Sequence, residues 1–345
     1  MLNLELDKHK MIVDLKNYSQ QIKATLADLV KFNPEIGSFE NIVFCGMGGS
    51  AIGGDLIRAC FENEIEIPML VCRDYVLPRF VDPETLVIVC SFSGNTEETL
   101  ACLNDAKKLG AKILTISSGG EIEAESLKNK IPFFKLNYQS ECDQPRVNSG
   151  VMLTTVAVIL AKLNLIDLDK NIWERIIENI DGVSADCADE NEAENLAFEI
   201  AQKLQNKIPV FHGAGFLSTV ARRFKQDVNE TSKQFAFYEE VPESNHNATV
   251  GYEFPEAKKD LIMVSLESSL DYPRNEIRWE ILKQIWDKRG LEQLAIMTDF
   301  ETKLEQVFHL VYLGMWVSYY LGILNKIDPT PVEAIKFLKD GLAKS

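Results

Sequence analysis

The sequence predicts an α/β fold, with doubly wound, mainly parallel sheets flanked by helices. Short apolar runs typical of buried strands alternate with helical patterns, and glycine- or serine-rich turns follow several of these runs. Such alternation is characteristic of parallel βαβ units, whose sheets are covered on both faces. The alternation occurs twice, on either side of an acidic segment without strand signals. We therefore predict two similar α/β domains in tandem.

The first half of the chain supplies four strands and three helices of this fold. We expect strands over residues 41–45, 67–72, 86–90 and 112–117. We expect helices over residues 53–61, 96–109 and 151–163. Taken in order, these elements form repeated strand–helix–strand units, so the strands should lie parallel in one sheet.

The second half resumes the alternation after an acidic, helical stretch over residues 164–206. Strands are expected over residues 209–212, 261–265 and 293–297. Helices are expected over residues 218–229, 275–288 and 331–343, the last with Pro331 at its first position. The segments IVFCGMGGSAIGGDLIRA and IPVFHGAGFLSTVARRFKQ both run strand, G-x-G, helix, which suggests an internal duplication. The predicted domains are residues 1–165 with a leading helix, a helical connector 166–200, and residues 201–345.

One apolar segment, residues 307–324, is long enough to cross a membrane. It contains His309, Ser318 and three tyrosines, and no second apolar segment of that length exists. We interpret it as a buried core helix and expect no membrane association.

Composition narrows the class of protein. The chain has 345 residues, 46% of them apolar and 26% charged, which is typical of a folded globular protein. The net charge of −16 argues against nucleic-acid binding, because no general excess of Lys and Arg is available to contact phosphates. The N-terminus lacks the continuous apolar core of a signal peptide. We expect a cytoplasmic protein.

The seven cysteines are scattered, odd in number and never spaced as C-x-x-C. Three of them, Cys45, Cys72 and Cys90, end apolar runs, where a thiol behaves as a small hydrophobic group. This spacing indicates a reducing compartment and predicts no zinc site.

The stretch CGMGGSAIGGD, residues 45–55, joins a predicted strand to a predicted helix. Glycines there let the backbone approach an anion at the helix N-terminus. Gly46, Gly48 and Ala51 formally match the dinucleotide fingerprint, with Asp74 as the candidate ribose-binding acid. A tight strand-to-helix turn needs glycines in any case, so the match is weak. The stretch lacks the G-K-[ST] of a P-loop, which disfavours hydrolysis of a nucleoside triphosphate.

The stretch SFSGNTEET follows another predicted strand and admits two interpretations. Thr96 or Ser93 is an ordinary helix cap, with the following acids favourable to the helix dipole. Alternatively, Ser91, Ser93 and Thr96 together bind a phosphate. One cap needs only one hydroxyl and three arrive together, so we favour phosphate binding. Ligands of open α/β sheets gather at the carboxyl ends of the strands, where both turns lie.

Three further residues attract attention for their chemistry. Arg146 stands alone in QPRVNSG, Glu230 ends a predicted helix in DVNETSK, and His246 lies in the loop PESNHNATVGYEFP. His212, at the end of a buried strand, and His309, within the long helix, are expected to be structural.

The ordered set GMGGSAIGGD, SFSGNTEETL, QPR, NE, PESNHN and DPTPVEAIKFLK resembles the bifunctional phosphoglucose/phosphomannose isomerase family. The motifs run in family order from residue 42 to residue 339. The resemblance implies two sugar isomerase (SIS) domains in tandem and interconversion of glucose 6-phosphate, and of mannose 6-phosphate, with fructose 6-phosphate. It also implies a cytoplasmic role in glycolysis and gluconeogenesis.

The resemblance assigns roles to particular residues. Ser91, Ser93 and Thr96 correspond to the phosphate-binding turn. The glycine turn contributes Gly48, Gly49 and Ser50 beside the substrate.

The remaining roles concern the reacting end of the sugar. Glu230 is similar to the base that moves a proton between C1 and C2, and Arg146 to the cation that stabilises the enediolate. His246 matches a histidine associated with ring opening, which comes from the neighbouring subunit of a homodimer. Thr330 resembles the residue that makes room for both C2 epimers. For the terminal lysine, the sequence offers Lys336 and Lys339, and we align Lys339.

General chemistry agrees with these roles. A shielded carboxylate has a tunable pKa suited to a general base, a guanidinium stabilises developing charge, and His and Lys suit ring opening. The predicted partner is a sugar phosphate, and we expect neither a cofactor nor a metal. Two rivals stay open: a non-catalytic sugar-phosphate-binding SIS regulator, and a dinucleotide-dependent oxidoreductase.

Overall fold

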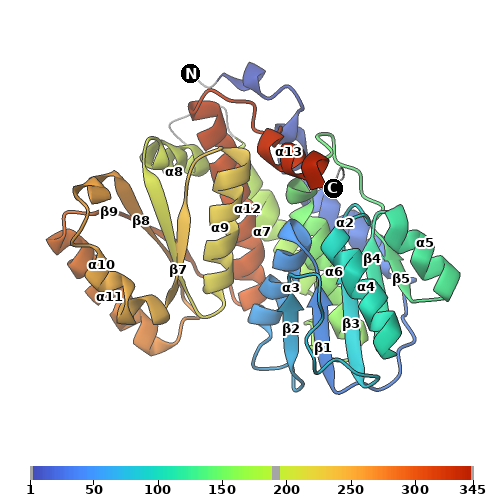
Figure 1. Ribbon diagram of the computed structural model, residues 1–345. Coiled ribbons are helices and arrows are strands. Elements are labelled where there is room, and N and C mark those ends of the chain that lie inside the picture. The colour runs from blue at the N-terminus through green and yellow to red at the C-terminus, as the bar shows by residue number, and fades with distance from the viewer. Residues whose placement is uncertain (1–2, 189–194, 343–345) are drawn as a thin grey trace. The chain divides into compact units, whose positions relative to one another are not determined.

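The computed structural model describes residues 3–188 and 195–342 and divides into two compact units (Figure 1). The N-sheet unit comprises Asn17–Glu178 and Lys303–Phe308. The C-sheet unit comprises Met1–Lys16, Asn179–Thr302 and His309–Ser345. Each unit contains one parallel sheet with its own helices.

The N-sheet unit contains a five-stranded parallel sheet in the order β2-β1-β3-β4-β5. Its strands are β1 (Asn41–Cys45), β2 (Met69–Cys72), β3 (Thr85–Cys90), β4 (Lys112–Ser117) and β5 (Phe133–Lys135). Every residue of β3 is buried, as expected for a central strand covered on both faces.

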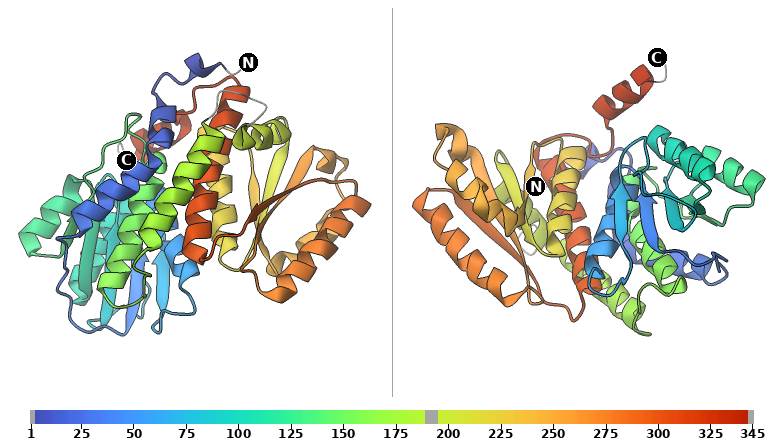
Figure 2. Two further views of the ribbon diagram at one scale, coloured as in Figure 1. Left: turned by 180° about the vertical axis from the view of Figure 1, so that it is seen from behind. Right: turned by 60° about the horizontal axis from the view of Figure 1, so that its bottom comes forward.

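Helices cover both faces of this sheet, as the views in Figure 2 show. They are α2 (Tyr18–Leu29), α3 (Gly48–Cys60), α4 (Glu97–Leu109), α5 (Gly120–Asn129) and α6 (Ser149–Lys162), with a short 3-10 helix, η2 (Pro145–Asn148), before α6. Helix α6 packs against α2 and α3. Its apolar face explains why the sequence pattern there indicated a buried helix.

The C-sheet unit contains a four-stranded parallel sheet in the order β7-β6-β8-β9. Its strands are β6 (Ile208–Ala214), β7 (Phe237–Val241), β8 (Leu261–Ser268) and β9 (Glu292–Thr298). Both sheets therefore share the order second–first–third–fourth strand. A glycine with positive φ follows the first strand of each, Gly48 at 50° and Gly215 at 52°. These shared features agree with the duplication that the two G-x-G segments suggested.

The C-sheet unit contains several α-helices and short 3-10 helices. They are η1 (Leu4–Leu6), α1 (Met11–Lys16), α8 (Leu196–Leu204), α9 (Leu217–Thr231), η3 (Glu243–His246), α10 (Ala248–Gly251), η4 (Glu256–Asp260), α11 (Pro273–Lys288) and α13 (Glu333–Leu342). Helices α7 (Ile172–Cys187) and α12 (Lys303–Leu324) continue from one unit into the other along the chain.

Helix α12 is the apolar segment tested above as a membrane span. It alone among the described helices has the length and hydropathy to cross a membrane, and 89% of its apolar window is buried. Its tyrosines bond to protein groups: the Tyr312 hydroxyl donates to Leu15 O at 2.8 Å, and the Tyr320 hydroxyl donates to Cys187 O at 2.7 Å. These contacts agree with a core helix.

The predicted element bounds are confirmed for β1 and β4, and most others shift by one to three residues. The start of α3 was wrong: the helix begins at Gly48, not Gly53. The prediction treated the glycines as turn residues, whereas a Cβ at Gly54 would lie 2.6 Å from the Phe44 ring. Close packing of helix on strand overrides the low helix propensity of glycine.

The prediction missed β5, β7 and α5 altogether. Strand β5 has three residues and β7 is a half-exposed edge strand, so neither leaves a continuous apolar run. Pro331 was expected at the first position of the last helix, but α13 begins at Glu333. The expected C-terminal end at residue 343 lies outside the described residues.

Candidate functional site

The strand order of the N-sheet unit identifies where a ligand is expected. In the order β2-β1-β3-β4-β5 the direction of winding reverses between β1 and β3, and doubly wound proteins bind ligands outside the strand carboxyl ends at this point. The turn after β1 is the glycine turn, residues 46–50. The turn after β3 is the serine turn, residues 91–96. The two conspicuous motifs thus flank one switch point (Figure 1).

The glycine turn brings backbone close to the neighbouring strand. A Cβ at Gly46 would lie 3.0 Å from Ala51 N and 3.1 Å from Cys90 O. Gly48 takes a φ of 50°, in the region that favours glycine, and opens α3. The buried Ser50 hydroxyl accepts a hydrogen bond from Phe92 N at 3.2 Å. This bond ties the glycine turn directly to the serine turn.

The serine turn is held by its own hydroxyls. The Ser91 and Thr96 hydroxyls lie 2.8 Å apart, and Ser91 Oγ also accepts from Gly94 N at 3.2 Å. Ser93 Oγ accepts from Asn95 N at 3.3 Å. Gly94 has a φ of 73°, and a Cβ there would collide with Gly119 O. The β4–α5 turn therefore fixes the shape of the serine turn from the other side.

The hydrogen bonds of Thr96 bear on whether the serine turn caps α4 or binds a phosphate. Thr96 occupies the N-cap position of α4, but its side chain makes no capping hydrogen bond. Its hydroxyl pairs with Ser91 instead. The amide groups of the first turn of α4 are thus left without a side-chain cap, at the positive end of a helix dipole. A helix N-terminus beside several hydroxyls suits a phosphate.

One of the two acids that follow the serine turn, Glu97, is held by a hydrogen bond from the loop after β2. The Tyr75 hydroxyl donates a hydrogen bond to Glu97 Oε2 at 3.2 Å, which directs this carboxylate to the loop after β2. In the same loop, Asp74 Oδ1 accepts from Tyr75 N at 2.7 Å, and Arg73 pairs with Asp55. Asp74, the candidate ribose-binding acid, is thus exposed and bonded to the backbone of the following residue.

Arg146 lies beside the glycine turn. It belongs to η2, only 6% of its surface is exposed, and its Nη1 donates to Gln144 Oε1 at 2.9 Å. Pro145 O is 4.0 Å from the Cβ position of Gly49. The QPR turn, which carries Arg146, therefore passes next to Gly49. A buried guanidinium is a fixed positive charge that stays protonated.

The C-sheet unit carries the other predicted residues. Glu230 is the penultimate residue of α9 and is half-buried. Within residues 3–188 and 195–342, its carboxylate makes no ion pair that would hold it in place. A half-buried carboxylate without a bound cation is suited to accept a proton.

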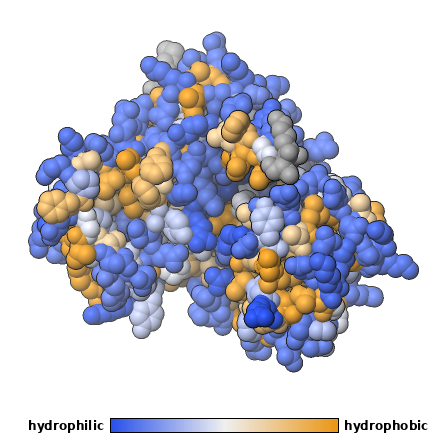
Figure 3. Space-filling model, in the orientation of Figure 1, coloured by the Kyte–Doolittle hydropathy of each residue, from blue (hydrophilic) through white to orange (hydrophobic). Residues whose placement is uncertain are grey.

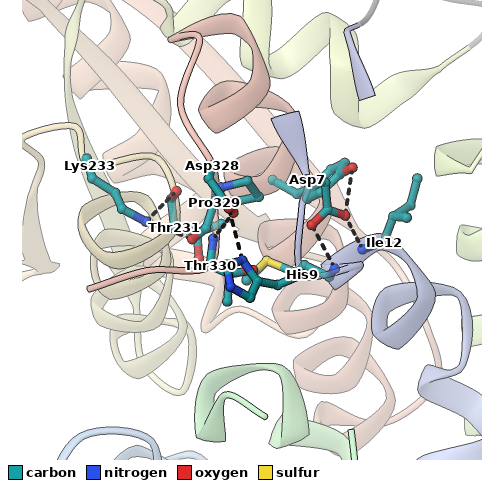
Figure 4. A network of polar contacts seen from close by, with 10 residues as sticks. Asp7, His9, Ile12, Thr231, Lys233, Asp328, Pro329 and Thr330 are labelled. Atoms are coloured by element: carbon teal, nitrogen blue, oxygen red, sulfur yellow. Dashed lines mark hydrogen bonds and ion pairs between the residues drawn. The ribbon is translucent and has the colours of Figure 1, made fainter. Parts of the chain in front are cut away.

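Thr330 is buried next to the end of α9 and is held by a polar network (Figure 4). Thr330 N donates to Asp328 Oδ1 at 3.0 Å, and Asp328 Oδ2 lies 3.0 Å from His9 Nδ1. Lys233 Nζ donates to Pro329 O at 2.7 Å and to Thr231 O at 3.4 Å. Lys233 thus connects the residues after Glu230 with the loop that carries Thr330.

The three histidines considered above differ sharply in environment. Burial lowers the pKa of His212 to about 4, and the ring contacts Val210 O at 3.0 Å. Burial likewise lowers the pKa of His309 to about 4, with Thr298 Oγ1 at 3.0 Å. Both are structural, as predicted. His246, in η3, is exposed, and its imidazole makes no hydrogen bond among the described residues.

The two candidate lysines, Lys336 and Lys339, both lie on α13 and are exposed. The structure does not distinguish between them. No described contact joins either lysine, or His246, to the other predicted residues. Within the N-sheet unit, by contrast, hydrogen bonds join Ser50 to the serine turn and Ser91 to Thr96, and Pro145 O lies 4.0 Å from the Cβ position of Gly49. The remaining predicted residues of this unit, Gly48, Ser93 and Arg146, lie on the same three turns.

The equivalent switch point of the C-sheet unit, between β6 and β8, carries two carboxyl groups, one of which pairs with Lys283 Nζ at 2.7 Å. Glu267, near the end of β8, and Asp271, just after it, are buried there. Burial raises the pKa of Asp271 to about 6, and Trp279 Nε1 donates to its Oδ2 at 3.0 Å. These carboxyl groups make this edge less favourable for a phosphate than the serine turn of the N-sheet unit.

Sequence reasoning missed one cluster of reactive groups. The sulfur atoms of Cys45, Cys72 and Cys102 all lie within 4.8 Å of one another. The expectation of no zinc site rested on the spacing of the cysteines along the chain, and this spacing does not show which cysteines meet in the folded protein. Strand pairing and helix packing bring them together. The available signal was that two of them end consecutive strands.

Comparison with known proteins places the chain among phosphosugar isomerases. Residues 193–342 match the family model "Bacterial phospho-glucose isomerase C-terminal SIS domain". A Caldicellulosiruptor bescii protein named bifunctional phosphoglucose/phosphomannose isomerase is 36% identical over 339 residues, covering 97% of this chain and 99% of that protein. An Aquifex aeolicus protein of the same name is 32% identical, covering 90% and 92%.

A solved structure shows a similar fold at much lower identity. It is the C-terminal domain of glucosamine-fructose-6-phosphate aminotransferase from Francisella tularensis, with a TM-score of 0.71 and 16% identity. The match covers 94% of this chain and 98% of that one. The similarity extends over both parallel sheets and their helices.

Proposed function

The chain belongs to the bifunctional phosphoglucose/phosphomannose isomerase family, and from this premise we propose that it interconverts glucose 6-phosphate, and mannose 6-phosphate, with fructose 6-phosphate. The observation that carries the proposal is the serine turn at the β1/β3 switch point. Its hydroxyls and the uncapped first turn of α4 supply donors for a phosphate dianion. The corresponding edge of the other sheet carries the buried carboxyl groups of Glu267 and Asp271.

The phosphate anchors the substrate, and the remaining roles follow from the family resemblance. We assign Ser91, Ser93 and Thr96 to the phosphate, and Gly48, Gly49 and Ser50 to close approach of backbone to the sugar. Thr330 is assigned to the C2 substituents, where a small side chain leaves room for both epimers. The network through Asp328 fixes its backbone.

The proposed reaction is a proton transfer through a cis-enediol. After ring opening, Glu230 removes the C2 proton of the aldose while O1 gains a proton, which gives the enediol. The same proton returns to C1 as O2 loses its proton, which gives the ketose. Arg146 stabilises negative charge on the enediolate oxygens, as a guanidinium does without losing its own proton. His246 and Lys339 are assigned to ring opening at the ring oxygen and O1.

The proposal includes a homodimer in which His246 serves the neighbouring subunit. His246 is exposed, and the exposed apolar side chains of Val250, Phe254 and Tyr272 follow it in the sequence. Figure 3 shows apolar residues gathered on the side of the C-sheet unit that carries α10 and α11. Clustered apolar residues on a surface favour a protein interface. We further propose a cytoplasmic location and a role in glycolysis and gluconeogenesis.

A direct assay separates the proposed activity from its rivals. Purified protein is incubated with glucose 6-phosphate or mannose 6-phosphate without any dinucleotide, and fructose 6-phosphate is measured after quenching. An isomerase forms the ketose under these conditions. A regulatory protein binds the sugar phosphate without forming product, and an oxidoreductase needs added dinucleotide. Initial rates on the two aldoses give the epimer preference.

The role of Glu230 is tested by the isosteric change Glu230→Gln. We expect turnover to fall by at least about a hundredfold, because general base catalysis contributes this much or more, while sugar-phosphate binding measured by calorimetry persists. Glu280→Gln, which changes an exposed acid on α11, is the matched control and should leave both unchanged. Retained activity in Glu230→Gln would reassign the base.

The enediol route has its own test. In deuterated solvent, some of the proton held by the base exchanges, so deuterium should appear at C2 of recovered aldose. Complete absence of exchange, with the hydrogen passed directly from carbon to carbon, would contradict the enediol route without affecting the assignment of substrate.

A further inference from the structure

Three buried thiols of the N-sheet unit lie together, outside the residues assigned to the sugar phosphate. Cys45 ends β1, Cys72 ends β2, and Cys102 lies on α4. Their sulfur atoms are all within 4.8 Å of one another, and the three side chains are 0%, 7% and 1% exposed. Among the described residues no other group of His, Cys, Asp or Glu meets this criterion.

The fold itself creates the cluster. Cys45 and Cys72 are paired directly across the parallel strands β1 and β2, so their side chains leave the same face of the sheet. Helix α4 covers that face and inserts Cys102 between them and the loop after β2. Cys102 Sγ contacts Asp74 O at 3.2 Å, and Cys72 Sγ contacts Val76 O at 3.6 Å. The loop oxygens thus form the rim of the cluster.

The spacing of the sulfur atoms is close to that of a metal–thiolate site. With Zn–S bonds of about 2.3 Å, three sulfurs arranged trigonally around the ion stand about 4.0 Å apart. The observed limit of 4.8 Å therefore requires shifts of less than about an ångström. If the three thiols only filled space in the core, nothing would require their sulfur atoms to lie beside one another.

The surroundings allow an ion to enter and be held. Apolar side chains surround the sulfurs, including Val43, Leu77 and Val81. Cys72 retains some exposure beneath a loop whose Val76 is 68% exposed, so the cluster lies just under the surface.

We propose that Cys45, Cys72 and Cys102 form a three-thiolate site for a soft divalent d¹⁰ ion, Zn²⁺ or Cd²⁺. Thiolate ligands select such ions, and carbonyl oxygens of the rim or a water can complete the coordination. Binding forms three metal–sulfur bonds, breaks three S–H bonds and releases three protons to the solvent. The loaded site carries one net negative charge, and no oxidant or reductant is involved.

The test uses the reduced, metal-free full-length chain and Cd²⁺ as the probe. Titration should show sulfur-to-cadmium charge-transfer absorption that saturates at one ion per chain. X-ray absorption should report three sulfur ligands. Because binding occurs to the folded state, Cd²⁺ should also raise the unfolding temperature.

Variants identify the ligands. Cys72→Ser should weaken Cd²⁺ binding at least about tenfold, which corresponds to about 1.4 kcal/mol. Cys102→Ala should do the same. The matched control is Cys60→Ala, which removes a buried thiol of the same unit that lies outside the cluster and should leave the affinity unchanged.

Several outcomes would overturn the proposal. They are absence of charge-transfer absorption in the unsubstituted chain, unchanged affinity in Cys72→Ser, or equal loss in Cys60→Ala. If Cys72→Ser or Cys102→Ala fails to fold, the absorption spectrum of the unsubstituted chain decides. Fewer than three sulfur ligands there would show that the thiols only pack.

Discussion

At the scale of single residues, Thr96 has one role for its backbone and another for its side chain. The residue caps α4 by its backbone, while its side chain turns to Ser91 and not to the helix amides. The local sequence favoured a phosphate site over a simple cap but allowed both. Only the pairing of two hydroxyls, seen in three dimensions, shows that the side chain is not used for capping.

The first residue-scale prediction concerns this hydroxyl. Thr96→Val keeps the shape but removes a donor to the phosphate, so the KM for glucose 6-phosphate should rise about 10- to 100-fold, as expected for a hydrogen bond to a charged group. Steady-state kinetics measures it. Thr99→Val, one turn later, is the control: its buried hydroxyl makes no hydrogen bond among the described residues, so KM should not change. An equal rise in both variants would refute a specific role for Thr96.

The second residue-scale prediction concerns pH. The pKa of Asp271 is raised to about 6 by burial, so the folded state holds this proton more tightly than the unfolded state, with a pKa near 4. The stability contributed by the protonated form is complete below about pH 4 and is lost as pH rises through about 6. The loss is at most about 3 kcal/mol.

Asp271→Asn removes this titration while keeping an acceptor for Trp279. The variant should be more stable than the parent at pH 7, and the difference should shrink as pH falls from 6 to 4. Thermal unfolding across this pH range measures it. A difference that stays constant with pH would show that Asp271 titrates normally in the folded protein.

At the scale of elements, glycine is used in two different ways. Gly94 is required by a positive φ and by the oxygen of Gly119. Gly54 lies within α3 and is required by packing, because the Phe44 ring occupies the space of a side chain. The sequence shows a glycine-rich stretch around Gly54 and a single glycine in the serine turn, and neither pattern reveals which constraint applies. The prediction therefore placed the start of α3 after the glycines and was wrong by five residues.

The element-scale prediction is a pair of Gly→Ala changes with opposite signs. Gly54→Ala should destabilise the protein by about 1–3 kcal/mol, since an added methyl overpacks the contact with Phe44. Gly182→Ala lies inside α7 with open space around it and should stabilise by about 0.5–1 kcal/mol. Denaturant unfolding measures both. Loss of stability in Gly182→Ala, or none in Gly54→Ala, would contradict this account of helix packing.

At the scale of the whole molecule, the proposed function depends on residues that the chain distributes over two units. The serine turn and Arg146 belong to the N-sheet unit, whereas Glu230, Thr330 and His246 belong to the C-sheet unit. His246 is exposed and is assigned to the site of a second copy. Activity should therefore require a homodimer.

Mixed dimers test this assignment. His246→Asn and Glu230→Gln should each be nearly inactive alone. Refolded together, they should recover roughly a quarter of the parent activity, because a two-fold dimer then contains one intact site in half of the molecules. Each variant refolded with itself is the control. No recovery, with mixed dimers verified by mass, would show that His246 acts within its own subunit or not at all.

The sequence by itself determined the α/β class, the position of most strands, and the family. These follow from local causes: apolar runs of strand length, turn glycines, and an ordered set of short motifs. It also identified the hydroxyl residues of the serine turn, to which we assign the phosphate. Short or edge strands such as β5 and β7 were missed because their stabilisation comes from pairing, which leaves little trace in hydropathy.

The tertiary structure alone decided which distant residues meet. The order of strands placed the glycine and serine turns at one switch point and gave the other sheet an acidic edge. It also gathered Cys45, Cys72 and Cys102, which are 27 and 30 positions apart along the chain, into one cluster. Spacing in sequence carries no information about such encounters, because they arise from parallel strand register and from the helix that covers the strands.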